Sequence, residues 1–323
     1  MIELTCCLLL SASALAQQPK PLRLVATVPM PQVEGRIDHM AIDVAGQRLF
    51  VAALGNNTLE VIDVKNAKLL RTIAGLHEPQ GVAYTPDSNR IYVANRADGS
   101  LHIYDGVSFA MLKTISYASD ADNVRYDAQA DRLWVGYGEG GLGEFEQTGG
   151  KVRDVALGAH PESFQLEAHG SRIFVNLPPL HKIAAVDRQT GKVTASWPID
   201  DATANYPMAL DEADHRLFVV CRHPARLLVL DTSTGKLIAS LPVVGDSDDL
   251  FYDVARKRIY AIGGEGAISI FEQQDADHYR ELQRIATAAG ARTGYFSADL
   301  RRLFVAARRR GSQPAEIRIY EVE

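Results

Sequence analysis

The residues with the most chemical potential recur every 40 to 44 residues along the chain. One polar series comprises Asp38, Gln80, Asp122, Glu162, Tyr206, Asp248 and Arg292. The residues that follow them form a second series, His39, Gly81, Asn123, Ser163, Pro207, Asp249 and Thr293. Carboxylates that are brought together repel one another. Either some of them are protonated, with raised pKa values, or a cation lies among them.

The residue types in the two series suggest roles for a binding or catalytic site. Asp122, Glu162 and Asp248 are candidate metal ligands, and with Asn123 they offer the hard oxygen atoms that suit Ca²⁺ or Mg²⁺. His39 is a candidate general base or transition-metal ligand. The remaining candidates are Asp249 as a second base, Arg36 and Arg292 as bidentate partners of an anionic group, and Asp38, Asn123 and Tyr206 as ligand-binding residues. The alternative is that these side chains only line a water-filled channel, cap strand ends and pair with each other.

Three further histidines, His77, His160 and His181, are expected to lie in loops without a metal. The chain has no His-x-His or His-x₃-His spacing, so the sequence does not indicate a preformed zinc site. It also lacks a Gly-x-Ser-x-Gly nucleophile elbow and a P-loop lysine motif.

A repeated sequence pattern, an arginine followed by a short apolar run, indicates which elements position these residues. Ten residues after each member of the first series comes an arginine followed by a short apolar run: Arg48, Arg90, Arg132, Arg172, Arg216, Arg258 and Arg302. A period near forty, with β-branched and aromatic runs separated by Gly, Asp and Pro turns, is typical of a β-propeller. We expect an all-β fold, one seven-bladed propeller domain over residues 17–323, with four antiparallel strands in each blade.

Acidic residues accompany the arginines. Five residues before the arginine an acid stands in five of the seven units, at Asp43, Asp127, Glu167, Asp211 and Asp253. These positions flank the turn between the first two strands of a blade. Each acid is therefore expected to pair with its arginine, in a structural contact that contributes about 0–1 kcal/mol when exposed.

The last unit is incomplete. Only two residues follow Glu321, so the seventh blade lacks a fourth strand. The segment Leu22–Pro29 resembles the fourth-strand segment Leu237–Pro242. We expect the N-terminal strand to complete the C-terminal blade, because ring closure removes exposed sheet edges.

The repeat resembles a known group. The segment Arg90-Ile-Tyr-Val-Ala-Asn95 and the turn Asp231-Thr-Ser-Thr-Gly-Lys236 are similar to those of the YVTN-repeat, YncE-like β-propeller family. The resemblance covers residues 21–323 and is specific for the fold. It implies an exported or surface scaffold, a ligand binder or, in a few members, a lactonase.

The N-terminus and composition narrow the classes of function. Residues 1–16 resemble a signal peptide, with an apolar run over Leu4–Leu10 and a small-residue cleavage site before Gln17. The alternative is an apolar terminus that is not cleaved. After residue 16 no apolar run is long enough to span a membrane. Cys221 is the single cysteine after residue 16, and we expect it to be buried and inert. The net charge of −6 disfavours nucleic acid as a partner.

These observations lead to one hypothesis and two alternatives. We expect a periplasmic or secreted monomer that binds a small polar molecule, a metal ion or a protein at the acidic mouth of the central channel. The first alternative is a divalent-metal-dependent lactonase or ester hydrolase, in which the cation polarises the carbonyl group and activates water. The second is a protein-interaction scaffold with an empty channel.

Overall fold

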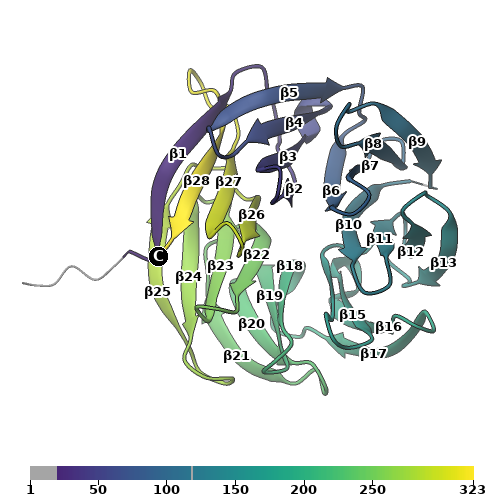
Figure 1. Ribbon diagram of the computed structural model, residues 1–323. Coiled ribbons are helices and arrows are strands. Elements are labelled where there is room, and N and C mark those ends of the chain that lie inside the picture. The colour runs from purple at the N-terminus through teal and green to yellow at the C-terminus, as the bar shows by residue number, and fades with distance from the viewer. Residues whose placement is uncertain (1–19, 118) are drawn as a thin grey trace, which may run out of the picture.

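The computed structural model describes residues 20–117 and 119–323. These residues form seven four-stranded sheets, arranged as blades around a ring (Figure 1). Neighbouring strands within each blade are antiparallel, and the first strand of each blade lies innermost. The expected fold, a seven-bladed β-propeller, is confirmed. The signal peptide expected over residues 1–16 lies outside the described residues.

The strands follow the repeat in chain order. Blades one to four comprise β2 (Met40–Asp43), β3 (Arg48–Ala53), β4 (Thr58–Asp63), β5 (Lys68–Ala74); β6 (Pro79–Thr85), β7 (Arg90–Asn95), β8 (Ser100–Asp105), β9 (Met111–Ser116); β10 (Ala121–Asp127), β11 (Arg132–Tyr137), β12 (Gly141–Glu146), β13 (Lys151–Ala156); and β14 (Phe164–Leu166), β15 (Arg172–Leu177), β16 (Lys182–Asp187), β17 (Lys192–Pro198).

Blades five to seven comprise β18 (Thr203–Asp211), β19 (Arg216–His223), β20 (Ala225–Asp231), β21 (Leu237–Pro242); β22 (Ser247–Asp253), β23 (Arg258–Gly263), β24 (Ala267–Gln273), β25 (Tyr279–Ala286); and β26 (Gly294–Ser297), β27 (Arg302–Ala307), β28 (Ala315–Val322), β1 (Leu22–Met30). Two short 3₁₀ helices, η1 (Leu54–Asn56) and η2 (Pro178–Leu180), lie between the second and third strands of blades one and four. Neither helix in the described part of the chain has the length and apolar character needed to cross a membrane.

Burial differs between the strands of one blade. In five blades the second strand, for example β3 or β27, is buried along its whole length after the leading arginine, and in β11 and β19 only the last one or two residues are more exposed. Neighbouring blades cover both faces of these strands, which explains why their sequences are continuous apolar runs. The outermost strands, such as β5 and β17, expose most of their residues. Cys221 is buried within β19, as expected.

The expected pairing of each repeat arginine with its preceding acid is correct in only part of the ring. Within residues 20–117 and 119–323, Arg48 pairs with Asp43 at 2.6 Å and Arg172 with Glu167 at 2.5 Å. In the other three acidic units the carboxylate contacts a different group: Asp127 contacts Arg188, Asp253 contacts Arg256, and Asp211 accepts a hydrogen bond from Gln273. The prediction was wrong there because side chains from the next turn or blade reach the same carboxylate.

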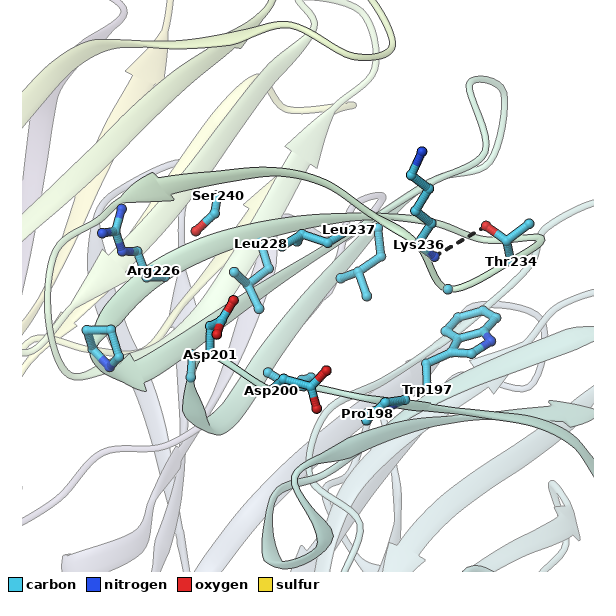
Figure 2. Close-up of a pocket in the computed structure, with 15 residues that line it drawn as sticks. Trp197, Pro198, Asp200, Asp201, Arg226, Leu228, Thr234, Lys236, Leu237 and Ser240 are labelled. Atoms are coloured by element: carbon cyan, nitrogen blue, oxygen red, sulfur yellow. Dashed lines mark hydrogen bonds between the residues drawn. The ribbon is translucent and has the colours of Figure 1, made fainter.

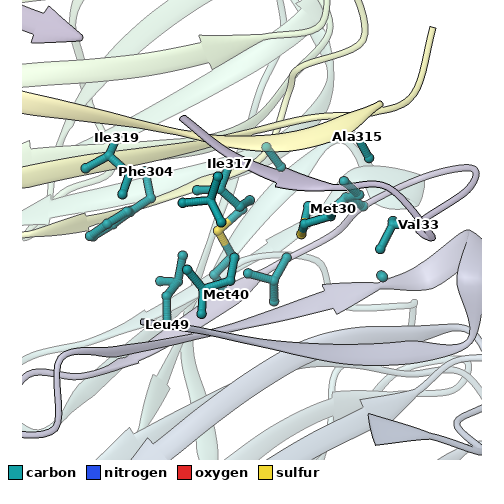
Figure 3. Close-up of a cluster of buried hydrophobic side chains, with 14 of the residues drawn as sticks. Met30, Val33, Met40, Leu49, Phe304, Ala315, Ile317 and Ile319 are labelled. Atoms are coloured by element: carbon teal, nitrogen blue, oxygen red, sulfur yellow. The ribbon is translucent and has the colours of Figure 1, made fainter. Parts of the chain in front are cut away.

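Strand β1 closes the ring, as the sequence predicts. It pairs with β28 from Leu22 opposite Val322 to Met30 opposite Ala315. Figure 3 shows the apolar cluster beneath this seam, in which Met30 from β1 packs with residues of blades one and seven, including Met40, Leu49, Phe304 and Ile317. The N-terminal strand thus both completes the last blade and fills its junction with the first.

Deleting residues 21–30 should lower the melting temperature by about 10 °C or more, because it removes a whole strand and its buried side chains. Met30→Ala alone should cost about 2–5 kcal/mol, since Met30 is fully buried. Leu24→Ala on the same strand is the matched control, expected to change stability by less than about 0.5 kcal/mol because Leu24 is 51% exposed. Thermal and urea unfolding measure all three, and an unchanged melting temperature of the deletion variant would contradict the closure.

Candidate functional site

The two polar series lie where the inner strands depart from a regular ladder. In blades two, three, five and six the pairing of the first two strands shifts register at this point, for example between Ala121 and Val124. In blades one, four and seven the series lies just before the first strand begins, at Met40, Phe164 and Gly294. A β-bulge or strand start frees side chains from strict alternation, so consecutive residues of both series can face the channel mouth.

The structure brings most of the predicted site residues to one small cavity of about 20 Å³. Its lining residues are Arg36, His39, Gln80, Asp122, Asn123, Glu162, Ser163, Tyr206 and Asp248. The cavity has room for about one water molecule or one ion. Asp38 and Asp249 adjoin it through His39. Arg292 does not line this cavity; its guanidinium pairs with Asp246 at 3.0 Å.

His39 is held between two carboxylates. Its Nδ1 lies 3.2 Å from Oδ1 of Asp249, and its Nε2 lies 3.5 Å from Oδ1 of the fully buried Asp38. Burial alone would lower the pKa of His39, but the charges of Asp249 and Asp38 overcome it and raise this pKa to about 10. His39 is therefore an imidazolium at neutral pH. Asp38 itself has a pKa raised to about 6, because its burial outweighs the attraction of His39 and Arg36.

Two arginines neutralise Asp248. Nη2 of Arg222 donates a hydrogen bond of 2.5 Å to Oδ1 of Asp248, and Nη2 of Arg36 lies 3.6 Å from Oδ2. The same Arg36 atom lies 2.7 Å from Oδ2 of Asp38. Arg222 also stacks over Tyr206, with its Cζ 4.1 Å from the ring centroid. The charge of Asp248 is thus compensated by two guanidinium groups.

Asp122 and Glu162 lie together with His160, a residue expected from the sequence to be a loop histidine without a metal. Ligand atoms of Asp122, His160 and Glu162 all lie within 4.8 Å of one another. Nδ1 of His160 is 2.7 Å from the carbonyl oxygen of Gly138 and donates to it, so Nε2 is the ring nitrogen that a metal could take in exchange for its proton. Nε2 lies 3.7 Å from Oδ2 of Asp122. This arrangement is a nitrogen and two carboxylates around one point.

Electrostatics mark the same cluster. Burial and the charge of Asp122 raise the pKa of Glu162 to about 8. Burial would also raise the pKa of Asp122, but His160 and His39 overcome it and hold that pKa below its ordinary value. Burial opposes the charge on His160, yet Asp122 and the Gly138 carbonyl raise its pKa to about 9.

Several oxygen atoms at the cavity have no protein partner. Among the described residues, Oε1 of Gln80, Oδ1 of Asp122 and Oδ1 of Asn123 are buried without a hydrogen bond from the protein. An unsatisfied buried oxygen costs about 1–3 kcal/mol. Three such atoms on residues that line one small cavity form an electron-rich environment that suits a cation or a hydrogen-bond donor.

A signal for His160 was present in the sequence. Two residues before each member of the first series stands a third series, Arg36, Glu78, Asp120, His160, Ala204, Asp246 and Gly290, in which five residues carry ionisable side chains. Extending the repeat alignment by two residues would have included His160. Arg222 lies outside the three series, at the end of the second strand of blade five, where its counterparts six residues after the repeat arginine include Arg96 and Arg308.

Gly81 sets the approach of blades two and three at the site. A Cβ atom on this residue would lie 2.0 Å from the carbonyl oxygen of Asp122 and 2.9 Å from the backbone nitrogen of Val124. Only glycine allows strands β6 and β10 to come this close. The position of Asp122 therefore depends on the residue opposite it.

A separate hollow of about 580 Å³ lies at the outer side of blades four and five (Figure 2). Trp197 and Leu228 form part of its apolar wall, and Lys236 and Asp200 lie at its rim. In the turn between β20 and β21, the backbone N–H of Lys236 donates a hydrogen bond to the hydroxyl oxygen of Thr234. The hollow lacks the buried, unpartnered oxygen atoms of the channel cavity, so the channel mouth is the better candidate site.

Comparisons with known proteins agree with the fold. No family model matches the chain, and no curated protein matches its sequence. A solved structure titled Kuenenia stuttgartiensis hydrazine synthase is similar, with a TM-score of 0.73 over 91% of this chain and 96% of that chain. The sequences are 16% identical, so the similarity shows a shared β-propeller fold and nothing about the reaction.

The cation-free protein should lose stability as pH rises from about 6.5 to 9. Folding raises the pKa of His39 from 6.5 to about 10, of His160 from 6.5 to about 9 and of Glu162 from 4.5 to about 8. In this window the folded state keeps protons that the unfolded state has released, so each such group lowers the free energy of unfolding by up to about 1.4 kcal/mol per pH unit. Urea unfolding in EDTA across this range measures the slope.

Variants identify which groups cause this loss of stability with rising pH. His39→Asn and His160→Asn should each flatten the pH profile. His169→Asn is the control, because His169 is 91% exposed and should leave the profile unchanged. Stability that is constant or increases over this window would contradict the assignment.

Gly81→Ala should destabilise the protein by about 1–3 kcal/mol or more, because the new methyl group meets backbone atoms of β10. Ser163→Ala, at the equivalent position of blade four, should cost less than about 1 kcal/mol. Chemical denaturation measures both. Equal stability of Gly81→Ala and the wild type would show that β10 can move away.

Proposed function

We propose that this protein is a binding protein and that its ligand site is the channel mouth. In this proposal Asp122, His160 and Glu162 hold a divalent cation, and a small polar molecule binds at or beside it. The proposal depends on one observation above all: residues that line the small cavity carry buried oxygen atoms without protein partners, and two of the lining residues, Asp122 and Glu162, cluster with His160.

The donor set supports a cation more strongly than it supports a plain water channel. A cation would lower the repulsion between Asp122 and Glu162 and would compete with the proton that the raised pKa assigns to Glu162. The amide oxygens of Gln80 and Asn123 are neutral donors that could complete its coordination. Water alone would satisfy the oxygen atoms but would not offset the burial and the charge of Asp122 that keep Glu162 protonated.

The imidazole refines the choice of metal. Ca²⁺ and Mg²⁺, expected from the sequence, prefer oxygen ligands only, whereas a nitrogen ligand with carboxylates suits Mn²⁺ or Zn²⁺. We therefore infer that a transition metal binds more tightly than Ca²⁺ or Mg²⁺. The side chain of Arg36 is 44% exposed beside this cavity, where it could contact an anionic group of the bound molecule.

Export, membership of the YncE-like group and a monomeric state are further parts of the proposal. The first is supported by the signal-like residues 1–16, and the second by the segment Arg90–Asn95 and the turn Asp231–Lys236. A protein partner at the same face is compatible with each of them.

The hydrolase alternative has less support. His39, the first candidate base, is an imidazolium between two carboxylates and cannot accept a proton in that state. Asp249, the second, accepts a hydrogen bond of 2.8 Å from the backbone of Gly294 and faces His39 with its other oxygen. Neither base is free to activate water as the cavity stands. Turnover of a lactone panel by the metal-loaded protein, lost in Asp249→Asn, would favour this alternative.

Metal binding to the full chain tests the proposal. After EDTA treatment, titration calorimetry should show one site, with Mn²⁺ or Zn²⁺ binding more tightly than Ca²⁺ or Mg²⁺. Asp122→Asn, His160→Gln and Glu162→Gln should each weaken binding by about tenfold or more, since losing even an outer-shell partner of a metal typically costs about tenfold to a hundredfold. The cation should also raise the melting temperature of the wild type.

Asp246→Asn is the matched control, because this acid lies at the same mouth and pairs with Arg292 and Arg222 outside the cluster. It should leave metal affinity unchanged. A protein that binds none of the four cations at millimolar concentration would overturn the proposal, as would equal affinity in all variants.

A further inference from the structure

The channel holds a second compartment, different in character from the mouth. A chamber of about 350 Å³ is lined by the inner strands β2, β6, β10, β14, β22 and β26. His39 lines both this chamber and the small cavity at the mouth, so the ionic group of His39, Asp38 and Asp249 separates the two. The chamber extends along these strands toward the turns that carry the repeat arginines, with Tyr84, Tyr126 and Phe296 near that end.

Arg125 brings a positive charge into this chamber. Its Nη1 donates a hydrogen bond of 3.0 Å to the carbonyl oxygen of the adjacent Val124, and its Cζ lies 5.6 Å from the ring centroid of Phe164. Across residues 20–117 and 119–323, no carboxylate oxygen lies within 4.0 Å of its guanidinium nitrogen atoms. Most of its hydrogen-bond donors are therefore available to another group.

This arrangement is costly for a protein that only needs to fill its channel. A partly buried guanidinium that lacks a carboxylate partner loses hydration without gaining an ion pair. Burial accordingly lowers the pKa of Arg125, in spite of the attraction of Asp249. Asp249 cannot supply the missing partner, since its oxygens are engaged by His39 and by the backbone of Gly294.

The other lining groups define what would fit beside Arg125. Tyr295 and Gln165 place polar groups in the chamber, and Gln165 uses its Nε2 to donate to the carbonyl oxygen of Met208. Apart from His39 and Asp249, the other lining side chains are apolar or aromatic, including Phe251, Val82 and Ile42, although polar atoms form the larger part of the exposed lining. A planar carboxylate matches the guanidinium fork in two parallel hydrogen bonds, and an apolar body matches these walls.

We propose that the Arg125 chamber is a binding site for a small organic carboxylate with an apolar body, distinct from the cation site at the mouth. The guanidinium of Arg125 binds the carboxylate group, Tyr295 donates to it through its hydroxyl group, and the aromatic walls enclose the apolar part. The channel then has a cation compartment and an anion compartment, separated by the His39 ion pairs. This inference does not require that the cation site be occupied.

Benzoate is the probe, because it combines one carboxylate with one apolar ring. Titration calorimetry of the full chain in EDTA should show benzoate binding, with weaker binding of acetate and none of benzamide, its uncharged analogue. In Arg125→Met the dissociation constant for benzoate should rise by about tenfold to a hundredfold, the effect of losing a charge-assisted bidentate contact. Tyr295→Phe keeps the ring and should weaken binding severalfold.

The stability of Arg125→Met distinguishes a ligand-binding arginine from a structural one. Its melting temperature without ligand should equal or exceed that of the wild type, since the substitution removes an unpaired buried charge. Arg132→Met is the matched control on the neighbouring strand β11, where the arginine points its Nη1 to the carbonyl oxygen of Asp131; it should leave benzoate affinity unchanged.

Three results would overturn the proposal. The first is that the wild type does not bind benzoate at about 10 mM, a concentration at which even a millimolar site would be occupied. The second is equal benzoate binding by the wild type and Arg125→Met, and the third is equal binding of benzamide and benzoate by the wild type. If Arg125→Met fails to fold, Tyr295→Phe and the benzamide comparison still decide the question.

Discussion

The pairing of β1 with β28 is the constraint on which the rest of this structure depends. A propeller has a channel only when its ring is closed, and here the closing contact joins residues almost three hundred positions apart. The junction also reaches the functional end of the channel, where the Thr293 hydroxyl group of blade seven donates to the carbonyl oxygen of Ile37 before blade one. Without this seam, Asp38 and His39 would have no fixed position relative to Asp248 and Asp249.

Ring closure forces charges of both signs into a small volume. The mouth gathers carboxylates from blades one, three, four and six, and burial makes each of them expensive. Arg36, Arg222 and His39 compensate the carboxylates of Asp38, Asp248 and Asp249. Asp122 and Glu162 are left with His160 as their nearest positive group, and Glu162 with its raised pKa is the least compensated. Because the carboxylates of Asp122 and Glu162 are less compensated than those of Asp38, Asp248 and Asp249, they mark the part of the mouth where a cation would be most favourable.

The same imbalance has the opposite sign deeper in the channel. Arg125 lies among aromatic and apolar walls, while the nearest acid of the chamber lining, Asp249, is engaged by His39. The two compartments therefore differ in the group that is least compensated. At the mouth this group is the carboxyl group of Glu162, and in the chamber it is the guanidinium of Arg125. Both follow from one geometric fact: the inner strands of a propeller point side chains into a space too narrow to be hydrated like the surface.

The sequence by itself determined the blade number, the strand order and the seam, because each blade is a local repeat whose apolar runs and turns are set by near neighbours in the chain. It also placed the polar series at the channel mouth, because equal positions in a rotational repeat face one axis. Only the tertiary structure decided which members pair. Arg222 neutralises Asp248, His160 joins Asp122 and Arg292 pairs with Asp246, whereas Arg125 has no carboxylate partner in the described part of the chain. Such pairing depends on distances of a few ångströms between different blades, and these distances arise only when the ring is closed.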